Sequence, residues 1–212
     1  MERSLRQGGH PVFQALTLVL VLLALCPRVP VSAAFLYPQR FISIVYDDSG
    51  SMQQEGKSDQ ANYALQTLCA LLDRQDILYV TRMGKPDTAV EVPIQEDRQS
   101  AIDALRYAPE GGGYTPYEAV QTAMDVFRDQ KKRILPNTEC WLIVLSDGIM
   151  QRSRDRAEDP AQVERRLKEF ARTAVVPEVT PRVAYFAIGS DAAIFQSEPE
   201  NGFFAYQSQA DE

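Results

Sequence analysis

The stretch Phe41-Ile-Ser-Ile-Val-Tyr-Asp47-Asp-Ser-Gly-Ser51 decides the fold of this chain. Its first six residues are almost continuously apolar, which is typical of a strand buried on both faces of a sheet. Turn-forming polar residues follow at once, and apolar side chains then recur at helical spacing over about residues 57–73. A buried strand that leads into a helix is the opening unit of an α/β domain.

The rest of the sequence continues this alternation. Two strand-like runs, Ile77–Met83 and Thr88–Ile94, are joined by a short turn, which predicts an antiparallel hairpin whose second strand lies at a sheet edge. Later strands are predicted at Cys140–Ser146, Arg182–Ile188 and Phe203–Gln207, and helices at about 98–107, at about 115–129 and from 159. The pattern predicts an α/β, Rossmann-like doubly wound fold: a mostly parallel sheet with one antiparallel edge strand and helices on both faces.

The N-terminal residues are predicted to be an export signal. In residues 1–33, basic side chains precede an apolar run at Phe13–Cys26, and small residues precede Ala34. The run is shorter than the roughly 20 residues of a membrane-spanning helix, so cleavage is favoured over an uncleaved anchor. Residues 34–39 are then a short linker and 40–212 one domain, whose last helix is expected to belong to a longer natural protein. An extracellular, cell-surface or envelope location follows.

Composition excludes several classes of function. The formal net charge is −7, and without the predicted signal 19 basic and 28 acidic residues leave −9. Such a domain is a poor ligand for nucleic acid or anionic lipid, so membrane association is expected only through the N-terminal segment or regions beyond residue 212. The single histidine, His10, lies in the predicted signal, which excludes histidine-based catalytic triads and zinc sites from the processed domain.

Oxygen-bearing side chains follow the predicted strands where ligands gather in open α/β sheets. Asp47, Ser49 and Ser51 follow the first strand, Thr115 follows a glycine loop at 111–113, and Asp147 follows the strand that begins at residue 140. This set contains neither sulfur nor imidazole. It suits Mg²⁺, with Mn²⁺ or Ca²⁺ as alternatives.

The run Asp47-x-Ser49-x-Ser51, the threonine Thr115 and the Ser-Asp-Gly run around Asp147 resemble the metal-ion-dependent adhesion site, or MIDAS, of von Willebrand factor type A domains. The resemblance covers about residues 40–210 and implies an exported, bacterial-type protein of this family with a complete MIDAS. It implies that the serines ligate the cation directly, that the threonine ligates directly or through water, and that the two aspartates hold coordinated waters. A partner protein would supply an Asp or Glu to the remaining coordination position, in adhesion or protein binding without catalysis.

Neighbouring residues have simpler interpretations. The run Thr115-Pro-Tyr-Glu118 has the form of a capping box, so Thr115 is also expected to cap the following helix, a role that would compete with metal ligation. Asp48 is expected to lie in a solvated turn that faces away from the ligand set. Ser146 and Gly148 are expected to shape the turn after their strand.

Two pairs of residues leave alternatives open. Tyr114 and Tyr117 flank Thr115 and either contact a partner or are partly buried. Cys69 and Cys140 either form a disulfide, which an exported protein permits, or remain two buried thiols.

Two rival functions also remain. One is a structural scaffold of an envelope complex, in which the metal serves only stability. The other is a metal-dependent phosphoester hydrolase that uses the aspartate after the first strand. It is disfavoured because Ser49 stands where a haloacid-dehalogenase-like enzyme needs a second acid, and because no Gly-Lys-Ser/Thr follows the glycines.

Overall fold

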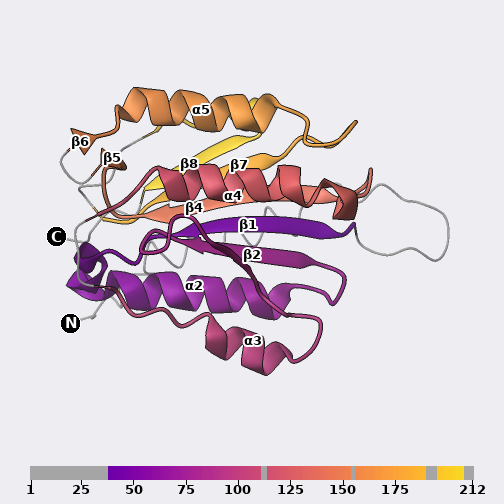
Figure 1. Cartoon of the computed structure of the whole chain (residues 1–212), viewed down its shortest axis with the longest axis horizontal. Helices are drawn as coiled ribbons and strands as arrows, with labels where there is room; N and C mark the ends of the chain where they lie inside the picture. Colours follow the sequence, from indigo (N-terminus) through magenta and orange to yellow (C-terminus); the bar gives the residue numbers. More distant parts are fainter. Residues whose placement is uncertain (1–37, 111–113, 154–155, 190–194, 208–212) are drawn as a thin grey trace, which may run out of the picture.

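The computed structural model describes residues 38–110, 114–153, 156–189 and 195–207 (Figure 1). The predicted signal, most of the linker and the glycine loop lie outside these residues. Six strands form one sheet in the order β3-β2-β1-β4-β7-β8, parallel except for β3, which confirms the predicted fold class. The strands are β1 (Arg40–Tyr46), β2 (Ile77–Arg82), β3 (Ala89–Glu91), β4 (Glu139–Ser146), β7 (Arg182–Ala187) and β8 (Phe203–Gln207).

Helices cover both faces of this sheet. In Figure 1, α4 and α5 lie on one side of the strands and α2 and α3 lie on the other. The helices are α2 (Lys57–Leu71), α3 (Arg98–Ala104), α4 (Glu118–Asp129) and α5 (Pro160–Arg172), with 3-10 turns η1 (Gly50–Gly56), η2 (Lys131–Arg133) and η3 (Pro199–Asn201). A small hairpin of β5 (Gln151–Ser153) and β6 (Arg156–Ala157), which the sequence pattern did not predict, follows β4. No helix in the described parts of the chain is long and apolar enough to cross a membrane.

The hydrophobic core is divided by the sheet into two layers. Side chains alternate along each strand, so Val45 packs in the layer under α4 and α5, whereas its neighbour Ile44 packs in the layer under α2 and α3. The two cysteines fall in different layers: Cys140 of β4 lies in the first and Cys69 of α2 lies in the second. Both are buried free thiols, so the disulfide alternative is wrong and the buried-thiol alternative is confirmed.

The strand register brings the ends of β1 and β4 together. Tyr46 at the end of β1 is paired with Leu145 near the end of β4, and the amide of Asp47 donates to the Leu145 carbonyl at 3.0 Å. The residues that follow both strands therefore lie at one edge of the sheet. This edge, where α2 and α4 also begin, is called the rim below.

Candidate metal centre

Asp47 is the buried centre of the rim. Its carboxylate accepts hydrogen bonds from the Ser49 amide at 3.0 Å and from the Ser146 hydroxyl at 2.8 Å. The amide of Asp147 adds a longer contact at 3.3 Å. Burial raises the pKa of Asp47, while the bonds from Ser49 and Ser146 act in the opposite direction. The Ser146 hydroxyl thus joins β4 to the loop after β1, a role beyond the turn geometry expected for it.

A chain of oxygen atoms links the two loops beside Asp47. The hydroxyl oxygens of Ser49 and Ser51 are 3.0 Å apart, and the Ser51 hydroxyl donates to Asp147 Oδ1 at 2.8 Å. Neighbouring ligands of an octahedral ion with bonds of about 2.1 Å are separated by roughly 3 Å. The donor set and the 3.0 Å between the two serine hydroxyls therefore fit a small hard cation such as Mg²⁺.

Thr115 lies against Gly148, the residue after Asp147, and makes no described hydrogen bond to Ser49, Ser51 or Asp147. Its hydroxyl donates to the carbonyl of Ile149 at 2.8 Å, and its amide donates to Gln151 Oε1 at 3.1 Å. Helix α4 begins at Glu118 with Tyr117 as its N-cap residue and without a side-chain cap. The predicted capping box is therefore wrong: the Tyr117 amide, which the threonine oxygen could have capped, donates instead to the Gln151 carbonyl at 2.9 Å. The expected competition between helix capping and metal ligation at Thr115 therefore does not arise.

Lys57 is a rim residue that the sequence analysis missed. Its ammonium nitrogen lies 3.1 Å from Asp147 Oδ2, and its side chain is buried. The available signal was a lysine at the first position of a helix, where a cation opposes the helix dipole.

Asp48 is not the solvated turn residue that was expected. Its side chain is fully buried, pairs with the Arg82 guanidinium at 2.6 Å and accepts the Gly84 amide at 2.7 Å. A long-range partner on β2 thus neutralises a carboxylate whose local sequence resembles an exposed turn. Asp48 makes no hydrogen bond to Asp47 or to Ser49–Ser51 among those described.

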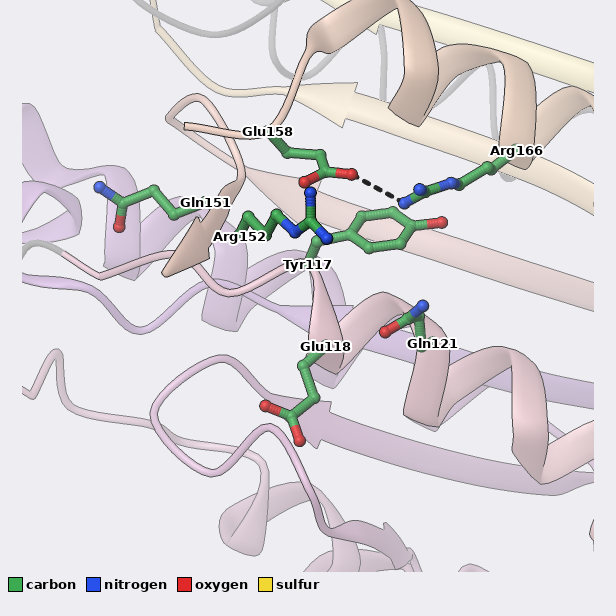
Figure 2. A pocket seen from close by; sticks show the side chains of 7 residues that line it. All are labelled: Tyr117, Glu118, Gln121, Gln151, Arg152, Glu158 and Arg166. Atoms are coloured by element: carbon green, nitrogen blue, oxygen red, sulfur yellow. Dashed lines mark hydrogen bonds and ion pairs between the residues drawn. The ribbon is translucent and has the colours of Figure 1, made fainter. Parts of the chain in front are cut away.

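A polar pocket of about 380 Å³ lies between α4, α5 and the β5–β6 hairpin (Figure 2). Tyr117 lines it, yet this residue is only 5% exposed, and the Arg166 guanidinium lies over its ring at 4.9 Å. Arg166 also pairs with Glu158 at 2.8 Å. Tyr114 is half-buried, so of the two tyrosines it offers more surface to a partner. Ile149, beside Thr115, is 47% exposed at the rim.

The rim differs from carboxylate- or histidine-rich metal sites. Among the described residues, no three or more His, Cys, Asp or Glu side chains are grouped so that they could hold a metal ion. The rim instead combines two aspartates with hydroxyl groups.

Comparisons with known proteins agree with the fold. A family model described as von Willebrand factor type A domain matches residues 42–149, just over half of the 212-residue chain. The solved structure of a von Willebrand factor type A protein from Catenulispora acidiphila is 18% identical with a TM-score of 0.50; the alignment covers 84% of this chain and 40% of that one. Proximal thread matrix protein 1 from the mussel byssus, described with a zinc-occupied MIDAS motif, is 15% identical with a TM-score of 0.51, and the shares covered are 83% and 46%. This chain thus spans less than half of either structure, and no curated protein matches it.

Proposed function

The chain belongs to the von Willebrand factor type A domain family, and from this premise we propose that it is an exported module that binds a partner protein through a divalent cation. Domains of this family are typically adhesion or protein-interaction modules and are generally not enzymes. The proposed partner presents an Asp or Glu side chain to the rim. Mg²⁺ is the proposed cation, and Zn²⁺, as described for the mussel protein, is a second metal to test.

The oxygen chain from Ser49 through Ser51 to Asp147 is the observation that supports this proposal best. It joins the loops after β1 and β4 with oxygen separations of 3.0 and 2.8 Å. When bound, a divalent cation would supply an electrophilic position for a carboxylate oxygen of the partner. The serine hydroxyls, with Thr115, are the proposed direct ligands.

The aspartates and the exposed rim residues have separate proposed roles. Asp47 holds the loops together through buried hydrogen bonds and, with Asp147, orients waters on the cation. Because neither carboxylate ligates the ion directly, the ion has no anionic ligand of its own, so an acidic partner is favoured. Tyr114 and the exposed Ile149 are proposed to contact the partner around its acidic side chain. For Tyr117 we propose only an indirect contribution, because its side chain is 5% exposed.

The test has two steps. Isothermal titration calorimetry should detect Mg²⁺ binding to the natural chain and little binding to Asp147→Ala. Capture of proteins from the native cell surface should then require Mg²⁺, disappear with a chelator and disappear with the same variant. Asp129→Ala is the matched control, because Asp129 is exposed at the far end of α4 and should change neither result. Magnesium-independent capture that survives Asp147→Ala would refute the proposal.

A scaffold role for the metal is the second candidate. Asp47 supports it, since this buried carboxylate connects the loops after β1 and β4 through its own hydrogen bonds. In that case Ser49→Ala would lower the melting temperature in Mg²⁺ but leave partner capture unchanged. Loss of capture at an unchanged melting temperature supports the recognition role instead.

A further inference from the structure

Lys57 places a positive charge inside the proposed metal site. Its side chain is 11% exposed, and its ammonium lies 3.1 Å from Asp147 Oδ2. The other oxygen of the same carboxylate accepts the Ser51 hydroxyl. Asp147 therefore contacts both Ser51, a proposed ligand of the divalent cation, and the ammonium group of Lys57.

The position of Lys57 is unfavourable in two ways. It is the first residue of α2, where the positive end of the helix dipole repels a cation. It is also largely withdrawn from water, which penalises an ammonium group that has no partner. The nearby carboxylate of Asp147 compensates for the helix dipole and for the burial, so the lysine charge is stable there only while this carboxylate is charged.

Gly189 provides the space that Lys57 occupies. This residue follows β7 with a φ of +91°, a conformation that L side chains rarely adopt. A Cβ atom at residue 189 would lie 3.0 Å from Lys57 Cε and 3.1 Å from its Nζ. The end of β7 is thus shaped to let the lysine reach Asp147, which is an observation independent of the ion pair.

We infer that Lys57 is a built-in counter-cation that neutralises Asp147 when no metal is bound and competes with a divalent cation for this carboxylate. The inference rests on the proposed function, because it assumes that the rim binds a metal. The ammonium keeps the loops after β1 and β4 together in the metal-free protein. Metal entry then requires the ammonium to withdraw from Asp147 or to remain as a nearby repulsive charge.

This arrangement would set the metal affinity below the value that the oxygen ligands alone would give. A fixed positive charge a few ångströms from a divalent ion opposes binding, and screening by salt is weak because the pair is buried. Substitution of the lysine by a neutral residue should therefore strengthen metal binding, whereas loss of an ordinary stabilising ion pair would leave it unchanged or weaken it.

The experiment measures Mg²⁺ dissociation constants by calorimetry and melting temperatures in chelator. Lys57→Met should bind Mg²⁺ about tenfold more tightly than the natural chain, which corresponds to about 1.4 kcal/mol, and should melt at a lower temperature without metal. Lys57→Gln, which keeps a polar group for Asp147, should also bind Mg²⁺ more tightly. It tests the same inference if Lys57→Met fails to fold. Lys57→Arg should restore the weaker binding because it restores the charge.

Lys132→Met is the matched control. Lys132 is exposed in η2, beyond the far end of α4, so this variant makes the same change in net charge away from the rim. It should leave the Mg²⁺ dissociation constant unchanged. If it tightens binding as much as Lys57→Met does, the effect belongs to overall charge and the inference is overturned.

The two proposals fail in distinguishable ways. Equal Mg²⁺ affinity in the natural chain, Lys57→Met and Lys57→Gln would overturn the counter-cation but leave the metal-binding function intact. Absence of Mg²⁺ binding in all of them, including the neutral variants, would overturn both.

Discussion

Asp48→Asn is expected to destabilise the fold strongly without affecting the metal site one residue away. The substitution preserves the shape of the side chain but removes its charge. Asp48 is fully buried, and its partners are the Arg82 guanidinium at 2.6 Å and the Gly84 amide at 2.7 Å. None of these contacts involves the serines or aspartates of the oxygen chain.

The expected loss of stability depends on the partners that Arg82 keeps after the substitution. Breaking a buried ion pair by removing one partner costs about 3–5 kcal/mol. Arg82 keeps a second carboxylate, Glu110 at 2.5 Å, but this group is 54% exposed and compensates only in part. The lower end, about 3 kcal/mol, is therefore expected, and it corresponds to a fall in melting temperature of about 6–12 °C for a chain of this size.

The assay is guanidinium denaturation, followed by Mg²⁺ titration of the folded variant. Asp129→Asn is the control, since the Asp129 side chain is 64% exposed and should lose less than about 0.5 kcal/mol. A loss in Asp48→Asn no larger than in this control would refute the energetic reasoning. A reduction of Mg²⁺ affinity comparable to that of Asp147→Ala would refute the separation of Asp48 from the metal site.

Three further predictions concern the sheet and its buried groups. Gly84→Ala would place a Cβ 2.9 Å from the carboxylate of the buried Asp48, which Arg82 holds in place. We therefore expect the free energy of unfolding to fall by about 1–3 kcal/mol in guanidinium denaturation. Unchanged stability would show that this carboxylate can move away. Burial raises the pKa of the Cys140 thiol to about 12, so Ellman's reagent should label it only after unfolding, and rapid labelling of the native protein would contradict its burial. The hydrogen bond from Arg133 lowers the pKa of Glu91, so the stability contributed by this pair is present above the ordinary glutamate pKa and is lost as the pH falls through the lower folded pKa. Because both side chains are about one-third exposed, the stability lost on acidification should be only about 0.5–1 kcal/mol smaller in Glu91→Gln than in the natural chain. Identical melting profiles of the two proteins from pH 7 to pH 3 would contradict the stabilising role of this pair.

Local sequence patterns determined the architecture and the identity of the candidate ligands. The apolar runs at β1, β4 and β7 are long enough to indicate strands buried on both faces, and the short turn before β3 permits only an antiparallel connection. Parallel strands carry their carboxyl ends to one edge, so Asp47 and Asp147 were expected to meet although they are 100 residues apart. The structure brings them together with Ser49 and Ser51.

Side chains with alternative partners could not be assigned in the same way. Thr115 has the local sequence of a helix cap, but the Ile149 carbonyl lies 2.8 Å from its hydroxyl and is separated from it by 34 residues. Asp48 stands in a turn sequence, but Arg82 on the adjacent strand makes its burial favourable. The Tyr117 amide that Thr115 could cap donates instead to the Gln151 carbonyl, so for both residues a tertiary contact replaces the locally expected role.

The sequence by itself determined the strands of the main sheet, the helices and the oxygen atoms that face the rim, because strand and helix periodicities depend on residues only a few positions apart. Only the tertiary structure decided that Lys57 neutralises Asp147, that Ser146 bonds Asp47, and that the two cysteines lie on opposite faces of the sheet. These outcomes depend on how strands and helices far apart in the chain are juxtaposed. The distance and burial of each partner set their energies, and neither quantity is encoded in a local pattern.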